Sequence, residues 1–321
     1  QLPRFEEVAE SAGVVDVAPG MSAGWGDYDD DGHPDLYVSN MFSAAGHRVT
    51  GQSRFHTRAD EATKGYFRRH ARGNSLFSNL GDGRFKDVSV FAGVTLGRWA
   101  WASHFTDFDD DGQLDLLVAN GFISQRSADD LCSFYWRQVV SQSPLQRVPD
   151  PGEDYLGAFS ELSQRIREGH SFSGGERNCA FLNRGGGSFV DLSFALGLDF
   201  DDDGRGIALT DLDGDGDIDV CATNRTAPRL RLLRNDLRDQ NRAVALRLVG
   251  NPAENCPRDA IGARIEVDVA GATRHRTLAA GSGFASQSSK WIHVGLGQAS
   301  EVSAVRVRWP GGSTEQFDGV G

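Results

Sequence analysis

Short apolar runs bounded by polar residues recur along most of the chain. Three of them begin with aspartate and end with asparagine, at residues 35–40, 115–120 and 219–224. Two more, at 74–79 and 178–183, also end with asparagine and precede glycine-rich turns. Short apolar runs between turn residues are typical of strands buried in a sheet. The pattern therefore predicts a fold rich in β-strands.

The runs belong to a longer repeat. Phe5, Phe85 and Phe189 each open a strand-like segment and lie 22 residues before the first aspartate of an acidic loop (27 − 5, 107 − 85 and 211 − 189). One repeat then holds four strands: the run into the loop, the run after it, the run ending in asparagine, and the phenylalanine segment. Four antiparallel strands repeated around an axis form a propeller blade. We predict an all-β fold of β-propeller-type blades followed by a small C-terminal β domain.

Three acidic loops of one design join the first and second strands of the repeats. Carboxylates stand at loop positions 1, 3, 5 and 9, and glycine stands at position 6, where the backbone must turn sharply. Calcium prefers six to eight oxygen ligands, which four carboxylates, a carbonyl at position 7 and water would provide. The loops therefore predict about three Ca²⁺ sites. The predicted ligands are Asp27, Asp29, Asp31, His33, Asp35, Asp107, Asp109, Asp111, Gln113, Asp115, Asp211, Asp213, Asp215, Asp217 and Asp219.

An EF-hand and a simple solvated turn are the two alternatives for these loops. An EF-hand needs glutamate at loop position 12 and helices on both sides. Position 12 is Val38, Val118 or Ala222, and strand-like runs flank each loop. A solvated turn would leave four carboxylates repelling one another unless a cation neutralised them. Both alternatives are weaker than a calcium loop between strands.

The repeats resemble the FG-GAP or VCBS blades that integrin α-chain propellers share with bacterial relatives of cartilage acidic protein. The C-terminal part is similar to the ASPIC/UnbV domain in the segments 261–267, 281–287, 293–297 (His-Val-Gly-Leu-Gly) and 307–312, which contains Trp-Pro-Gly-Gly. The resemblance covers nearly the whole chain. It implies propeller repeats over residues 1–238, with insertions at about 41–73 and 121–177, and an ASPIC/UnbV-like domain over 239–321.

Closure of the ring is open at this stage. The third repeat lacks its own phenylalanine strand after 230–235, and the Phe5 segment is the candidate to complete it. Three repeats are fewer than the four to eight blades of known propellers. Unrecognised blades, the C-terminal domain, another chain or a segment outside this sequence could each complete the architecture.

The charge and composition of the chain argue against two classes, nucleic-acid-binding proteins and membrane-spanning proteins. The formal charge of −12 in 321 residues argues against nucleic acid as a partner, and no apolar run is long enough to span a bilayer. The chain begins within the first repeat, so we expect it to be a mature form or a piece of a longer protein. The predicted location is secreted, periplasmic or at the cell surface.

The four cysteines are interpreted as structural. Cys179 and Cys221 lie in strand-like runs, whereas Cys132 and Cys256 lie in contexts where a disulfide is conceivable. Their spacing suggests no metal site.

Both insertions separate the second and third strands of a repeat, and both carry helical patterns. Strand connections alternate between the two ends of a blade, so the insertions are expected at the end opposite the calcium loops. Arginine and aromatic side chains there favour a binding face, although they could equally pack helices and pair with surface acids. The predicted face contains Arg68, Arg69, Arg72, Arg98, Trp99, Trp101, Phe134, Tyr135 and Trp136, with His70 and Arg205 nearby.

No catalytic motif is present: Gly-x-Ser-x-Gly, His-Glu-x-x-His and the P-loop are missing, and His104 is interpreted as a strand residue. The leading prediction is a calcium-stabilised extracytoplasmic interaction module that binds a protein partner or joins a larger assembly. The alternatives are an accessory subunit and, by resemblance, a calcium-dependent propeller enzyme of natural-product assembly that alkylates a small-molecule substrate by Friedel–Crafts chemistry.

Overall fold

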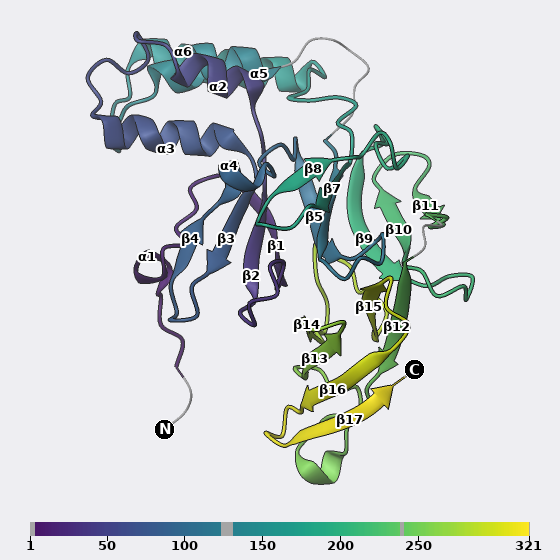
Figure 1. Ribbon diagram of the computed structural model, residues 1–321. Helices are drawn as coiled ribbons and strands as arrows, with labels where there is room; N and C mark the ends of the chain where they lie inside the picture. The colour runs from purple at the N-terminus through teal and green to yellow at the C-terminus, as the bar shows by residue number, and fades with distance from the viewer. Residues whose placement is uncertain (1–3, 123–130, 238–240, 321) are drawn as a thin grey trace.

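The first two repeats form four-stranded antiparallel sheets in the computed structural model, which describes residues 4–122, 131–237 and 241–320 (Figure 1). Both sheets follow chain order. The first contains β1 (Gly20–Gly26), β2 (Asp35–Asn40), β3 (Ser75–Asn79) and β4 (Phe85–Asp87). The second contains β5 (Ala100–Thr106), β6 (Asp115–Asn120), β7 (Cys179–Asn183) and β8 (Phe189–Asp191). The third has β9 (Gly204–Thr210), β10 (Asp219–Asn224) and β11 (Leu230–Leu233).

The first two sheets pack against each other through a shared buried cluster. Tyr37, Leu116 and Phe181 belong to one buried cluster shared by the first two sheets. Gly26 of β1 lies so close to Phe105 of β5 that a Cβ atom there would come within 2.6 Å of the ring. Glycine is therefore required at this position for close approach of the sheets.

The N-terminal phenylalanine strand is a wrong prediction. Residues 4–8 form no strand, Phe5 is fully exposed, and the short helix α1 (Ala9–Ala12) follows. Phe85 and Phe189 form strands because each pairs with the strand before it in its own repeat, across a tight turn. Phe5 pairs with no strand among the described residues. The third sheet consequently keeps three strands, and the sheets of the described residues form no closed ring.

The helices lie mainly in the two long connections. The connection from β2 to β3 contains α2 (Ala44–Thr50) and α3 (Glu61–Arg72), and the short α4 (Ser89–Ala92) follows β4. Between β6 and β7 lie α5 (Leu131–Phe134), the π-helix η1 (Tyr135–Val139), the 3₁₀ turn η2 (Val140–Gln142) and α6 (Glu153–Arg167). Both sets of helices pack together, and Figure 1 shows them at the end of the sheets away from the β1–β2 turn.

Two small sheets make up the C-terminal part. One has the order β14-β13-β16-β17 and the other pairs β12 with β15. The strands are β12 (Arg242–Arg247), β13 (Arg264–Val269), β14 (Ala272–Thr277), β15 (Trp291–Gly297), β16 (Val302–Arg308) and β17 (Thr314–Val320), with a 3₁₀ turn η3 (Pro252–Glu254). Their core contains Ile265, Val267, Val294 and Val305. The predicted boundary at 238/239 lies outside the described residues.

The β content confirms the all-β fold class. Among the described residues, no helix has the length and apolar character needed to span a membrane. The cysteines are structural: Cys132 packs within the insertions and Cys256 within the C-terminal core, and no disulfide joins them.

Candidate metal centres

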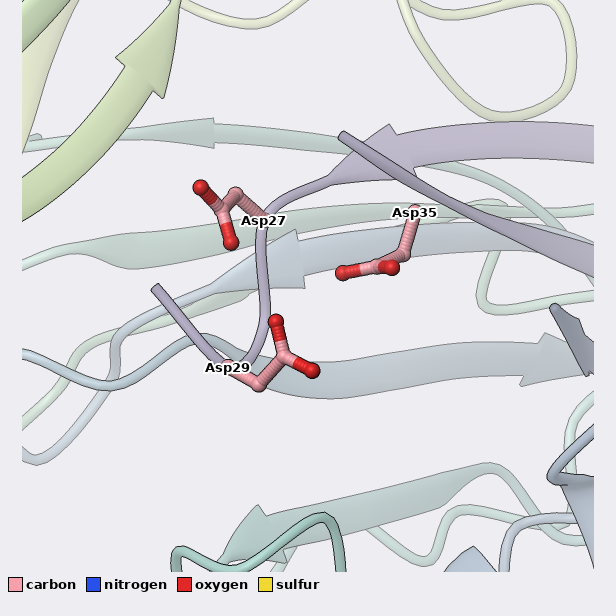
Figure 2. Close-up of side chains that lie close together, drawn as sticks. All are labelled: Asp27, Asp29 and Asp35. Atoms are coloured by element: carbon pink, nitrogen blue, oxygen red, sulfur yellow. The ribbon is translucent and has the colours of Figure 1, made fainter. Parts of the chain in front are cut away.

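Each acidic loop brings three carboxylates together. Oxygens from loop positions 1, 3 and 9 lie within 4.8 Å of one another in all three loops. Figure 2 shows this arrangement for Asp27, Asp29 and Asp35, whose carboxylates surround a common space between the loop and the start of β2. The other two groups are Asp107, Asp109 and Asp115, and Asp211, Asp213 and Asp219. These clusters consist only of oxygen donors, the ligand type that Ca²⁺ prefers.

The loop backbone adopts a turn that two positions make possible. The glycine at position 6 has a left-handed conformation in every loop, with φ between +87° and +104° for Gly32, Gly112 and Gly216. Position 4 is also left-handed: Asp30 has φ of +55°, Asp110 has +59°, and the third loop has glycine there. Aspartate tolerates this conformation better than most residues. The left-handed conformation at position 4 was not predicted from the sequence, although aspartate, aspartate and glycine at this position in the three loops are residues that tolerate it.

The position-9 aspartate links the loop to the third strand of the same sheet. Asp115 is fully buried, and its two oxygens accept the backbone N–H groups of Phe108 (3.2 Å) and Asn183 (2.7 Å). Asp35 does the same with Tyr28 and Asn79. This aspartate therefore fixes the loop to the end of the neighbouring strand before any ion binds.

Asparagines that end the third strands connect successive loops. Asn183 of the second sheet donates from Nδ2 to the Tyr28 carbonyl of the first loop at 2.8 Å. Asn235, which follows β11, makes the equivalent bond to the Phe108 carbonyl of the second loop at 2.9 Å. The three loops thus form a continuous hydrogen-bonded row, whereas Asn79 of the first sheet donates to the Pro34 carbonyl of its own loop at 2.9 Å.

The hydrogen bonding of Asp107 indicates that a cation fits in the second loop. One of its oxygens, Oδ2, accepts the N–H groups of Gly112 (2.9 Å) and Gly295 (3.1 Å). The other, Oδ1, is buried and has no hydrogen-bond partner. A buried carboxylate oxygen without a partner is costly, and a cation at this point would satisfy it.

Burial raises the pKa of four aspartates in the first two clusters. Desolvation is the main cause, and it raises the pKa of Asp27 to about 6, of Asp107 to about 7, of Asp35 to about 8 and of Asp115 to about 9. Neighbouring carboxylates raise these pKa values further by repulsion. The ionised form of these carboxylates is therefore disfavoured in the folded protein unless a positive charge is present.

The side chains at loop positions 5 and 7 are not part of the carboxylate cluster. The position-5 carboxylates of Asp31, Asp111 and Asp215 accept the backbone N–H of position 7 at 2.8, 2.7 and 3.2 Å. They are outside the groups of oxygens within 4.8 Å. The position-7 residues His33, Gln113 and Asp217 each donate that N–H, so their side chains are not what defines the turn. Their role as carbonyl ligands stays a prediction.

The C-terminal part lies directly on the first two loops. Arg274 reaches Asp30 with an Nη1–Oδ2 distance of 2.5 Å, and His293 Nε2 lies 2.5 Å from Asp110 Oδ1. Arg276, only 8% exposed, donates to the Gly112 carbonyl at 3.0 Å and lies 3.7 Å from Asp30 and 3.8 Å from Asp107. Basic groups of one part thus compensate the acidic loops of the other, a contact that sequence reasoning missed.

Comparison with protein families identifies these two parts. Residues 252–321 match the model described as ASPIC and UnbV, and residues 66–118, which run from α3 to β6 and include the second loop, match the FG-GAP-like repeat. The chain contains an FG-GAP-like repeat and an ASPIC/UnbV domain. Both are typical of extracellular-type interaction modules. No curated protein matches the chain, and a relation to cartilage acidic protein stays a prediction.

The ASPIC/UnbV domain contacts the second loop through its Gly-Leu-Gly segment. Gly295 donates its N–H to Asp107, and Gly297 donates its N–H to the Asp110 carbonyl at 2.8 Å. A Cβ atom on Gly295 would lie 2.4 Å from both Asp107 Oδ2 and the Asp110 carbonyl carbon. The small residue is therefore needed for contact with the FG-GAP part.

We expect Gly295→Ala to reduce the free energy of unfolding by about 1–3 kcal/mol, because the methyl group forces the domain away from the second loop. Gly157→Ala in α6 is the matched control, since nothing lies within 4 Å of the added methyl group. Denaturant unfolding of both variants measures the difference. Equal stability of the two variants would contradict the contact.

The third loop is the most exposed of the three. Two of its aspartates are expected to differ in their contribution to calcium binding. Asp213 belongs to the carboxylate cluster, whereas Asp217 at position 7 is expected to contribute only its backbone carbonyl. We therefore expect Asp213→Ala to weaken calcium binding more than Asp217→Ala. Calorimetric titration of both variants tests this order, and equal losses would show that the ligand assignment is wrong.

The predicted arginines of the insertion face divide into exposed and structural groups. Arg68 is exposed and pairs with Glu61 of its own helix at 2.7 Å. Arg69 and Arg72 instead reach Asp87 of β4 at 3.2 and 2.9 Å, which anchors α3 to the first sheet. Arg98 lies 3.6 Å from Glu176, joining the second sheet to the end of the second insertion.

Several predicted aromatic residues pack within the structure. Trp136 is 3% exposed in the core between the insertions, and Tyr135 packs beside it. Phe134 packs on the Arg165 guanidinium with 4.4 Å between the ring centroid and Cζ. Trp99 contacts two phenylalanines of the second insertion.

Trp101 faces the third sheet and the ASPIC/UnbV domain. Its ring contacts the Arg205 guanidinium, with 4.2 Å between Cζ and the ring centroid, and also Phe284. His104 is buried, burial lowers its pKa to about 4, and its Nδ1 lies 3.0 Å from Ser282 Oγ. Both residues thus serve contacts between elements.

Proposed function

We propose that this protein is a calcium-stabilised extracytoplasmic interaction module whose protein partner binds the helical insertions. The calcium loops contact the ASPIC/UnbV domain, whereas the insertions extend from the other end of the sheets (Figure 1). A partner on the insertions would therefore leave the metal centres undisturbed. Such a role agrees with the extracellular type of both domains.

The observation that carries this proposal is an open aromatic hollow between the two insertions. It has a volume of about 390 Å³ and is lined by residues of α3, η1, η2 and α6. Tyr66, Leu156 and Phe159 remain 58%, 51% and 50% exposed at or beside it. Large aromatic side chains around a pocket are typical of the centre of a protein interface, where a partner inserts an apolar side chain.

Calcium has a structural role in the proposal. Each ion would neutralise one cluster of carboxylates and hold one loop against the end of a sheet. The insertions start at the opposite ends of β2 and β6, so rigid sheets would present the hollow in one geometry. Preorganisation of this kind lowers the entropic cost of binding.

The test places a photo-crosslinking residue at Tyr66, and at Phe317 of the ASPIC/UnbV domain as a control. Proteins crosslinked only from position 66 are then purified and titrated against wild type and a Tyr66→Ala, Phe159→Ala double variant. We expect at least tenfold weaker binding by the double variant with an unchanged melting temperature. Wild-type affinity in this variant, together with loss of binding after changes beside the calcium loops, would place the binding surface elsewhere.

A further inference from the structure

A second cavity lies between the first sheet and the ASPIC/UnbV domain. Its volume is about 910 Å³, within the usual size of ligand sites. One wall is made by the first two sheets, with Trp25, Phe85 and Phe105 as its aromatic members. The other wall is one face of the sheet β14-β13-β16-β17.

Strand register places two arginines side by side on that second wall. Arg264 of β13 is directly opposite Arg308 of β16, and Thr277 and Thr314 continue the row on the outer strands. Like charges directly opposite each other on neighbouring strands are destabilising. Within the described residues, neither arginine has an ion-pair partner, and both are exposed.

The next row along the same strands shows the contrast. Arg306 of β16 is opposite Glu266 and lies 2.8 Å from its Oε2, and its Nη1 lies 2.6 Å from Asp268. Arg276, which also lines the cavity, pairs with aspartates of the acidic loops. Of the four arginines that line the cavity, only Arg264 and Arg308 therefore lack an ion-pair partner among the described residues, in a protein whose formal charge is −12. The acidic members of the lining are Asp27 of the first loop and Glu266.

The aromatic wall offers a flat apolar surface opposite these charges. Trp25 is 60% exposed, and its ring meets Phe85 edge to face with 6.1 Å between centroids. A large aromatic ring that lies in a cavity and stays exposed can stack on a flat ligand group. A guanidinium group binds a carboxylate through two parallel hydrogen bonds, and two arginines side by side offer two such groups to one acidic ligand.

We propose that this cavity binds an aromatic carboxylate, with its ring on Trp25 and its acidic group on Arg264 and Arg308. The same chemistry can come from a free small molecule or from a peptide that ends in an aromatic residue. This site is separate from the insertion hollow, and its test does not depend on the partner proposed there.

The experiment titrates the calcium-loaded protein with N-acetyltryptophan, its uncharged amide, and a short peptide with a C-terminal tryptophan carboxylate. Calorimetry should show binding of the acid and at least tenfold weaker binding of the amide. An Arg264→Gln, Arg308→Gln double variant and a Trp25→Ala variant should each lose tenfold or more in affinity for the acid. Arg229→Gln, a change of an exposed arginine outside the cavity, should leave affinity unchanged.

The two sources are distinguished by the peptide. Affinity at least tenfold above that of N-acetyltryptophan assigns the site to a protein terminus, and equal affinity assigns it to a small molecule. The melting temperature of the double arginine variant should be equal to or above that of wild type, because a repulsion is removed. A lower melting temperature, equal binding of acid and amide, or unchanged affinity in the double variant would overturn the proposal.

Discussion

Removal of calcium with a chelator is expected to lower the melting temperature of this protein on the order of 10 °C. Calcium at about 100 times the dissociation constant of a site stabilises the fold by about 2.7 kcal/mol, so three sites contribute about 8 kcal/mol. At an unfolding entropy of about 2 cal/mol/K per residue, one kcal/mol corresponds to roughly 1.5 °C in a chain of 321 residues. The physical cause is the buried, mutually repelling carboxylates at positions 1, 3 and 9. Scanning calorimetry with excess calcium and with chelator measures the shift.

The same carboxylates determine how the effect depends on pH. Without calcium, the pKa values of Asp27, Asp35, Asp107 and Asp115 are about 6, 8, 7 and 9 in the folded state, against an ordinary value of 3.8. The folded chain then binds more protons than the unfolded chain between about pH 4 and pH 9. The free energy of unfolding of the chelated protein should therefore fall as pH rises through this range, and the gain from calcium should grow.

A variant with Asp29→Ala, Asp109→Ala and Asp213→Ala is the control, because it removes one ligand from each cluster. Its melting temperature should respond little to calcium. Magnesium should stabilise wild type less than calcium does, since it demands a smaller octahedral site. If wild type melts at the same temperature with calcium and with chelator, the metal has no structural role.

Asp115→Ala is expected to cost about 2–5 kcal/mol of stability even in the absence of calcium. The change leaves the N–H groups of Phe108 and Asn183 without their acceptor, and each buried donor without a partner costs about 1–3 kcal/mol. Loss of a metal ligand adds to this when calcium is present. Urea unfolding in chelator at about pH 4, where the raised pKa of Asp115 has little effect on stability, isolates the hydrogen-bond contribution.

Asp111→Ala is the matched comparison from the same loop. Among the described residues, the Asp111 carboxylate accepts hydrogen bonds only from Gln113, two positions along, and it is outside the carboxylate cluster, so its removal should cost much less. A loss equal to that of Asp115→Ala would show that loop charge, rather than the link from the loop to β7, governs stability.

The sequence alone predicted the acidic loops, the strands on either side of them and the four-strand order of the first two sheets. These features depend on residues close together in the chain: glycine at position 6 permits the left-handed turn, and short apolar runs form the strands. The helical insertions were also predicted from sequence, because the basic side of α3 and the apolar spacing along α6 are local properties. The FG-GAP-like and ASPIC/UnbV matches agree with this local pattern.

Only the tertiary structure decided which predicted residues meet and what they serve. Phe5 forms no strand because strand formation requires a neighbouring edge, which its own residues do not encode. Arg72 anchors α3 and Trp136 fills the core between the insertions, and their place in the binding face stays a prediction. ASPIC/UnbV residues such as Arg276 pack on loop residues such as Asp30, and these positions are far apart in the sequence. Such contacts depend on how sheets stack and on complementary charge across them, and neither property is written in the spacing of residues along a single segment.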